Sequence, residues 1–140
     1  MRIERARSGL RFAGYASVFD RVDRGGDIVR AGAFRQSLAR GAKVPLLWQH
    51  QPGKQIGRIE HLAEDARGLQ VIGRLNDDEF GRQLARELEQ GRLSGLSFGY
   101  RVRNAEQGVS AREIRDLELL EVSLVRRPMQ PLACVHKIAS

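Results

Sequence analysis

Cysteine, aromatic residues and long apolar runs are all scarce in this sequence, and each shortage excludes a class of protein. The single cysteine, Cys134, cannot form an internal disulfide, which suits a reducing compartment. No apolar run approaches the roughly 18 residues that a membrane-spanning helix needs. Residues 1–15 carry charges but lack the apolar segment of a secretory signal. We therefore expect a cytoplasmic protein that has no membrane partner.

The net charge is +7, from 24 basic and 17 acidic residues. Such a charge is compatible with nucleic-acid binding. However, the arginines are scattered and many stand beside acidic residues, as in residues 85–92 and 111–118. The sequence has no basic run, no interleaved aromatic residues for stacking on a single strand, and no zinc-finger spacing. We therefore expect no specific nucleic-acid partner, although an acidic protein partner fits this charge.

The length and composition are those of one globular domain. The chain has 140 residues, of which 41% are apolar and 29% charged, which is enough for a single core. It contains no internal repeat, linker or low-complexity tract, so we expect one domain over residues 1–140. No His, Cys and Asp residues are grouped at metal-ligand spacing, so neither a metal nor another cofactor is expected.

The hydrophobic pattern predicts a mainly β domain with two short helices inserted. The expected strands cover residues 10–19, 43–50, 55–62, 68–75, 94–106, 114–125 and 132–138. The expected helices cover residues 32–41 and 76–91, with a loop at 20–32 and a turn at 51–54. Asn76 or Asp77 can cap the second helix, and Gly91 ends it. This order of elements indicates an α+β fold with a mixed, mostly antiparallel sheet.

One short motif suggests a nucleophile. Residues 95–99, Gly-Leu-Ser-Phe-Gly, fit the G-x-S-x-G spelling of the α/β-hydrolase nucleophile elbow. That elbow needs a helix after the serine and a later histidine, whereas a strand follows Ser97 here and the mid-chain histidines precede it. The elbow interpretation therefore fails. On a strand, Ser97 shares a face with Gly95 and Gly99, which either leave a notch for a substrate backbone or permit close strand packing.

Two further residues could activate this serine. A serine hydroxyl is a weak nucleophile until a base takes its proton, and His50 stands at the end of an apolar strand among bulky neighbours. Glu121 lies on an otherwise apolar strand, where a carboxylate is costly to bury without a partner. It could orient an imidazole as the third member of a triad. The alternatives are a surface histidine at a turn and a salt bridge between Glu121 and an arginine.

Several blocks of the sequence, taken together, resemble a known family. The blocks, in order, are residues 14–34, 44–50, 56–59, 68–75, 95–100 and 119–133. They are similar to those of the prohead serine proteases of HK97-type tailed bacteriophages and related gene-transfer particles. Blocks in the same order over nearly the whole chain are more specific than any one of them.

The resemblance implies a fold and an activity. The implied fold is a β-barrel with a few peripheral helices, like that of herpesvirus assembly proteases. The implied activity is that of an endopeptidase which cleaves scaffold and capsid precursors, and often itself, inside the procapsid in the host cytoplasm. Its partner would be the major capsid protein precursor with its scaffold segment, and a homo-oligomer is compatible with the sequence.

The resemblance also implies roles for individual residues. Ser97 would be the nucleophile and His50 the general base. Glu121 is the preferred third member and Asp27 the second choice, because His61 and His136 match no block. Backbone amides near Arg126 and Arg127 are candidates for the oxyanion hole. A nucleophilic Cys134 would leave Ser97 unexplained.

The alternative from another functional class is a catalytically inactive assembly or scaffold factor that retains the protease fold. Retained serine, histidine and acid residues argue against this alternative, but retention alone is not activity.

Overall fold

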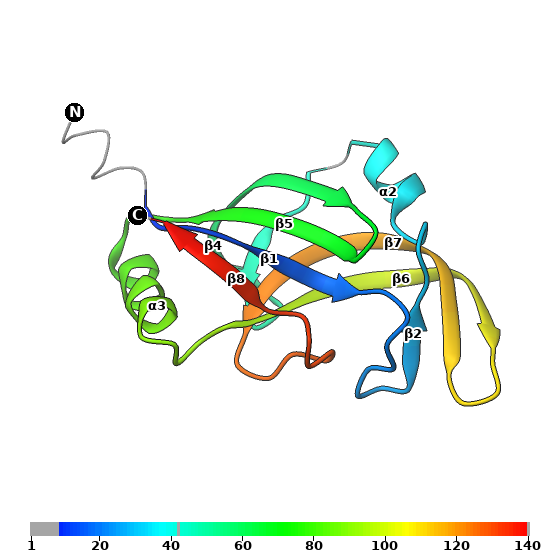
Figure 1. Cartoon of the computed structure of the whole chain (residues 1–140). Helices are drawn as coiled ribbons and strands as arrows, with labels where there is room; N and C mark the ends of the chain where they lie inside the picture. Colours follow the sequence, from blue (N-terminus) through cyan, green and yellow to red (C-terminus); the bar gives the residue numbers. More distant parts are fainter. Residues whose placement is uncertain (1–8, 42, 140) are drawn as a thin grey trace.

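The computed structural model describes residues 9–41 and 43–139 as a curled sheet with two helices at its margins (Figure 1). The helices are α2 (Arg35–Ala39) and α3 (Glu79–Glu89). The strands are β1 (Arg11–Val18), β2 (Asp27–Val29), β3 (Leu46–Trp48), β4 (Gln51–Glu64), β5 (Gly68–Leu75), β6 (Gly95–Gln107), β7 (Arg112–Val125) and β8 (Val135–Ala139). Among these residues no helix has the length and apolarity to cross a membrane.

The long strand β7 organises the sheet. Along one edge it pairs antiparallel with β6 over almost its whole length. Along the other edge it pairs in parallel with β2 near its start and with β3 near its end. From β3 the sheet continues through antiparallel pairs to β4, β5, β1 and β8. The predicted mixed, mostly antiparallel sheet is therefore confirmed.

The sheet curls towards a barrel without closing. The start of β6 approaches the segment before β8 through an isolated bridge between Gly95 and Cys134, flanked by a 3.0 Å hydrogen bond from Leu96 N–H to Ala133 O. A 2.7 Å hydrogen bond from Val135 N–H of β8 to Ser94 O lies beside this bridge, but β6 and β8 are not neighbouring strands in the sheet. The expected barrel is thus an open one, with α2 and α3 outside the sheet (Figure 1).

The strand β5 shows why the sequence forms this sheet. Along β5, buried positions alternate with partly exposed ones, and Leu69, Val71 and Leu75 lie in the core. This period of two is what a strand with one buried face requires. The predicted hairpin of β4 and β5 is confirmed by their antiparallel register.

The helix α3 follows its predicted pattern, with one correction at its start. Asp78, rather than Asn76 or Asp77, is the N-cap, and its carboxylate accepts a 2.7 Å hydrogen bond from Gly81 N–H. Leu84 and Leu88 face the core one turn apart. Gly91, with φ of +74°, follows the helix as predicted.

Two other sequence-based boundaries were wrong. The predicted loop over residues 20–32 contains the short strand β2, because β7 offers a free edge to Asp27–Val29. The predicted turn over residues 51–54 lies inside β4, and the chain reverses earlier, at Gln49 and His50. A turn of only two residues is too short to produce a recognisable sequence pattern.

Phe34 links α2 to the core beneath β6. Its side chain is fully buried, and its ring lies 5.1 Å from that of Phe98 and 6.2 Å from that of Phe19. The α2 N-terminus has no side-chain cap of its own. Instead, the Glu64 carboxylate accepts 2.8 Å hydrogen bonds from the N–H groups of Gly32 and Phe34. The buried ring and this carboxylate together hold the segment before α2 against the sheet.

Replacing Phe34 by Ala is expected to lower the free energy of unfolding by about 3–5 kcal/mol, because the change removes a fully buried ring and leaves a cavity. Urea unfolding followed by circular dichroism measures this loss. Val109→Ala, at a fully exposed position, is the matched control and should change stability by less than about 0.5 kcal/mol. A loss below about 1 kcal/mol for Phe34→Ala would contradict the role of this ring in the core.

Candidate active site

The register of β6 against β7 brings three polar positions together. Ser97 lies directly opposite Ser123, and Gly99 lies directly opposite Glu121. Opposed residues of an antiparallel pair have their side chains on one face, about 5 Å apart. Ser123 and Glu121 also share that face, because they are two residues apart on β7. The sheet therefore presents a hydroxyl, a second hydroxyl and a carboxylate from one face.

His50 reaches this face from the turn between β3 and β4. Gln49 and His50 form a two-residue loop and both have positive φ, 53° and 60°. Type I′ hairpins require positive φ at both central residues and usually place Asn or Gly there. Holding larger side chains in this conformation costs on the order of 1 kcal/mol or more for each residue. The turn therefore needs support from elsewhere in the fold.

That support comes from β7. Gln49 N–H donates a 3.0 Å hydrogen bond to the Leu124 carbonyl, and His50 N–H donates a 3.0 Å hydrogen bond to Ser123 Oγ. Ser123 Oγ in turn donates to Glu121 Oε1 at 2.7 Å. The buried Ser123 hydroxyl thus joins the His50 backbone to the Glu121 carboxylate.

The imidazole of His50 is oriented by Glu121. His50 Nδ1 is hydrogen-bonded to Glu121 Oε2. The carboxylate is the more buried partner, with a side chain 13% exposed against 42% for His50. When Nδ1 carries the proton of this bond, the neutral ring has an unprotonated Nε2 that can accept another proton. The geometry therefore leaves one basic nitrogen of His50 free for chemistry.

Ser97 and His50 line the same two cavities. The inner cavity, of about 100 Å³, is lined by Ala16, Ser17, Asp23, Asp27, Val29, His50, Ser97, Phe98, Tyr100, Met129 and Gln130. The outer cavity, of about 300 Å³, is lined by Gln49, His50, Ser97, Val125, Arg126, Arg127 and Met129. Ser97 is 6% exposed, and within the part of the chain that the structure covers its Oγ forms no hydrogen bond. Ser97 and His50 therefore border both cavities together.

The outer cavity contains one backbone donor that is already engaged. Arg126 N–H donates a 2.7 Å hydrogen bond to Gln49 Oε1. The Arg126 side chain is held as well, by a 2.8 Å ion pair with Glu87 of α3 and by its position 5.3 Å from the Trp48 ring. The hydrogen bond to Glu87 raises the pKa of Arg126 and lowers the pKa of Glu87. Arg126 is thus fixed beside Ser97 by several independent contacts.

The inner cavity contains a cluster of acidic and phenolic groups. Asp27 accepts two 2.9 Å hydrogen bonds from the Arg112 guanidinium and a 3.4 Å hydrogen bond from the Tyr100 hydroxyl. Burial, followed by the charges of Asp27 and Asp23, raises the pKa of Tyr100. Tyr100 therefore stays a neutral phenol at physiological pH.

The two glycines beside Ser97 do not clear a path for a substrate. A Cβ atom on Gly99 would collide with the Glu121 carboxylate, and one on Gly95 would collide with the Val125 carbonyl and the Pro128 ring. Neither glycine lines either cavity. The interpretation of a substrate notch was therefore wrong, and close strand packing is the reason for both glycines.

The other residues considered from the sequence lie apart from His50 or bind elsewhere. Asp27 lines the inner cavity with His50, yet its carboxylate is bonded to Arg112 and Tyr100. His136 lies 3.7 Å from the Cys134 sulfur, with its ring against Tyr15. Within the described part of the chain, no group of three or more His, Cys, Asp or Glu residues could hold a metal ion.

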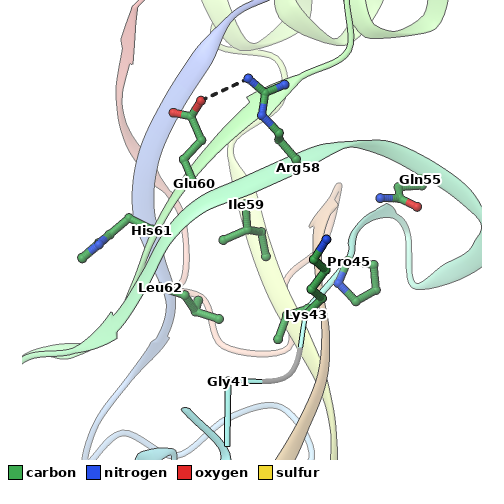
Figure 2. A pocket seen from close by; sticks show the side chains of 10 residues that line it. Gly41, Lys43, Pro45, Gln55, Arg58, Ile59, Glu60, His61 and Leu62 are labelled. Carbon is green, nitrogen blue, oxygen red and sulfur yellow. Dashed lines mark hydrogen bonds and ion pairs between the residues drawn. The ribbon is translucent and has the colours of Figure 1, made fainter. Parts of the chain in front are cut away.

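His61 lines a separate, open hollow of about 610 Å³ on β4 (Figure 2). Lys43 and an ion pair between Arg58 and Glu60 also face this hollow. Neither Ser97 nor His50 borders it. This larger hollow is therefore separate from the candidate active site.

Sequence reasoning missed Ser123 and Gln49. Ser123 stands two residues after Glu121 on a predicted strand, so the shared face was readable, but its bond to the His50 backbone was not. No sequence pattern indicated a role for Gln49, because its side-chain amide reaches Arg126 N–H only through the left-handed turn.

Comparison with known proteins places the chain in a family. The family model of the caudovirus prohead serine proteases matches residues 1–140. The prohead protease of Enterobacteria phage HK97 is 32% identical over 135 residues, which cover 92% of this chain and 60% of that protein. The chain thus spans less than two thirds of the length of this relative.

Solved structures show the same fold at low identity. The bacteriophage T4 capsid assembly protease, gp21, superposes with a TM-score of 0.66 at 15% identity, over 86% of this chain and 84% of that one. The KSHV protease, in complex with a hexapeptide phosphonate inhibitor, superposes with a TM-score of 0.60 at 13% identity, over 94% of this chain and 65% of that one. The expected likeness to herpesvirus and phage capsid proteases is confirmed at the level of the fold. Together with the match along the entire sequence, these results show that the chain belongs to the caudovirus prohead serine protease family.

Proposed function

We propose that this chain is a serine endopeptidase that cleaves capsid and scaffold precursors, and itself, inside the procapsid. In this proposal Ser97 is the nucleophile, His50 the general base and Glu121 the residue that orients His50. The observation that carries the proposal is the bond between Glu121 and His50 Nδ1, on a ring that borders the same cavities as Ser97. Family membership supports the same activity.

The proposed reaction is acyl transfer through Ser97. His50 Nε2 takes the proton of the Ser97 hydroxyl while Oγ bonds to the carbonyl carbon of the substrate. The tetrahedral intermediate collapses, the C–N bond breaks, and the leaving amine takes the proton from His50. Water, deprotonated by His50, then cleaves the acyl-enzyme and restores Ser97. The hydrogen bond from Ser97 to His50 forms on substrate binding, since such bonds are often long in unliganded enzymes.

The oxyanion of the intermediate needs N–H donors that are already in place. The backbone amides of Arg126 and Arg127 are the proposed donors, because both residues line the outer cavity with Ser97. Arg126 N–H is bonded to Gln49 Oε1, so the oxyanion must displace the Gln49 amide to use this donor. Gln49 therefore competes with the transition state for one hydrogen bond.

The first test is labelling by a fluorophosphonate, followed by intact-mass spectrometry. The wild-type protein should gain one adduct, Ser97→Ala should gain none, and His50→Ala should react about 10²–10⁴-fold more slowly because it lacks the general base. Ser110→Ala, at an exposed serine, is the matched control and should label like the wild type. An adduct that persists in Ser97→Ala would exclude Ser97 as the nucleophile.

A wild-type protein that does not react distinguishes two further cases. Labelling that appears only after co-expression with the capsid precursor indicates a latent protease. No labelling under either condition supports the alternative of an inactive assembly factor.

The role of Glu121 predicts a graded series of rates. Glu121→Gln is expected to slow acylation by about 10²–10⁴-fold, because an amide cannot stabilise the imidazolium as a carboxylate does. Ser123→Ala is expected to slow it by about tenfold, since it removes one bond to Glu121 and one to the His50 backbone. Single-turnover labelling measures both rates, and near-native circular dichroism confirms folding. A wild-type rate in Glu121→Gln would remove Glu121 from the mechanism.

The competition by Gln49 predicts a faster variant. Gln49→Ala frees Arg126 N–H and should raise the rate of phosphonylation by about 2–10-fold, the value of one net hydrogen bond. Gln51→Ala, on an exposed neighbour in β4, is the control and should react at the wild-type rate. Slower labelling of Gln49→Ala would mean instead that the Gln49 amide holds the Arg126 segment in its active position.

A further inference from the structure

We propose that the hollow on β4 is a docking groove for an extended acidic peptide segment of a partner protein, which adds there as a strand. The hollow lies between the segment before β3 and the second half of β4 (Figure 2). Neither Ser97 nor His50 borders it. The inference therefore goes beyond the proposed function and does not depend on it.

The hollow opens where β3 and β4 separate. These two strands pair as far as Leu46, which lies opposite Gly57. Beyond Gly57, among the described residues, β4 has a neighbouring strand only on its other edge, which pairs with β5. The chain before Leu46 follows β7 instead, and Pro45 O accepts a 3.1 Å hydrogen bond from Val122 N–H of that strand. The separation of β3 from β4 therefore leaves a free edge of β4 along the hollow.

This free edge is long enough to pair with a peptide strand. Five consecutive residues of β4, Arg58–Leu62, line the hollow. Five residues of extended chain span roughly 16 Å. The edge of a sheet presents N–H and C=O groups with which a second chain can pair, and peptide-binding domains use such edges for recognition. An extended segment laid along β4 would gain these main-chain hydrogen bonds.

The floor of the hollow is apolar. Val44, Pro45, Ile59 and Leu62 line it, and each of them is only partly buried. Val44, Ile59 and Leu62 also pack against the core, which holds the floor in place. Since every second side chain of a strand points to the same face, one face of an added strand can cover this surface. We therefore expect apolar residues at alternate positions of the peptide.

The rim of the hollow is positively charged. Lys43 and Arg58 border it, and within the described part of the chain Lys43 forms no ion pair (Figure 2). The Arg58 side chain is 65% exposed and lies 3.5 Å from the Glu60 carboxylate. Glu60 accepts 2.8 Å hydrogen bonds from Arg74 and Arg11, and the bond from Arg74 is the main cause of its lowered pKa. Because Glu60 is already paired with these guanidinium groups, the rim attracts carboxylates.

Charge and shape together select the occupant. A segment in which acidic and apolar residues alternate can place carboxylates beside Lys43 and Arg58 while its apolar side chains cover the floor. A second copy of this chain, with a net charge of +7, would be repelled at the rim. A nucleic acid offers phosphates but has neither a strand edge to pair with β4 nor aliphatic side chains for the floor. An acidic peptide uses the edge, the floor and the rim at once.

Fluorescence anisotropy with a labelled peptide tests this inference. The probe is a peptide of alternating glutamate and valine with blocked ends, about seven residues long, which is enough to span the free edge. The protein is the full chain with Ser97→Ala, so that binding is measured apart from cleavage. We expect saturable binding, and a lysine–valine peptide should bind at least about tenfold more weakly, because it brings like charges to the rim.

Methylation of the peptide backbone separates strand addition from simple charge attraction. A glutamate–valine peptide with methylated backbone nitrogens keeps its carboxylates and valines but cannot donate hydrogen bonds to β4. It should bind at least about tenfold more weakly than the unmodified probe, since two or more net hydrogen bonds are lost.

Substitutions at the rim locate the binding. Lys43→Gln and Arg58→Gln should each weaken binding by about two- to fivefold, the value of one exposed ion pair. Arg103→Gln removes the same charge at an exposed arginine of β6 and is the matched control, with unchanged affinity expected. Circular dichroism verifies that all three variants are folded.

Several results would overturn this inference. They are a lack of saturable binding by the glutamate–valine peptide, and equal affinities in Lys43→Gln, Arg58→Gln and Arg103→Gln. Displacement of the probe by a single-stranded DNA oligonucleotide, with no effect of backbone methylation, would identify a phosphate-binding surface instead. A dimer that Arg58→Gln dissociates in sedimentation would identify an interface between two copies. Fluorophosphonate labelling of Ser97 in the wild type tests the proposed function separately from all of these results.

Discussion

The antiparallel pairing of β6 with β7 in one register is the constraint on which the candidate site depends. It sets Ser97 opposite Ser123 and places Glu121 opposite Gly99, where no side chain obstructs the carboxylate. Since side chains alternate between faces, a slip of one residue would turn Ser97 away from Ser123 and Glu121. The register is strongly specified, because Leu96, Val122 and Leu124 are completely buried on the other face. Core packing on one face of β6 and β7 therefore also fixes the positions of Ser97, Ser123 and Glu121 on the other face.

The same strand stabilises the strained turn that carries His50. Left-handed conformations at Gln49 and His50 are unfavourable in isolation, yet the turn is hydrogen-bonded to Leu124, Ser123 and Glu121 of β7 and to Arg126, the residue that follows β7. Strain at a functional position persists only when surrounding contacts determine the conformation. Here those contacts also orient the imidazole, so one set of bonds both supports the turn and fixes the direction of the base.

The two cavities at Ser97 have different chemical characters. The outer cavity is bordered by backbone amides and the side chains of arginines, which favour a developing negative charge. The inner cavity is bordered by the carboxylates of Asp23 and Asp27 and by apolar surface.

Much of the fold was predictable from local pattern. The sequence correctly predicted the period of two in β5, the apolar repeat of α3 and the glycine after that helix. These features were predictable because burial of one face and capping are local properties. Motif order over the chain likewise identified the family, which the family model bears out. Ser97, His50 and Glu121 were singled out from their neighbours in the sequence, and their roles stay a proposal.

Only the tertiary structure decided how these residues meet and what surrounds them. The sequence left open whether the glycines beside Ser97 make a notch or permit close packing, because the atoms that fill their space, from Glu121 and Pro128, come from β7 and the segment after it. The two-residue turn and the bond from Arg126 to Gln49 depend on contacts between distant segments. The sequence by itself determined most of the elements, the family and the chemical groups available. Distance and direction between those groups were set by sheet register and packing, which no local pattern records.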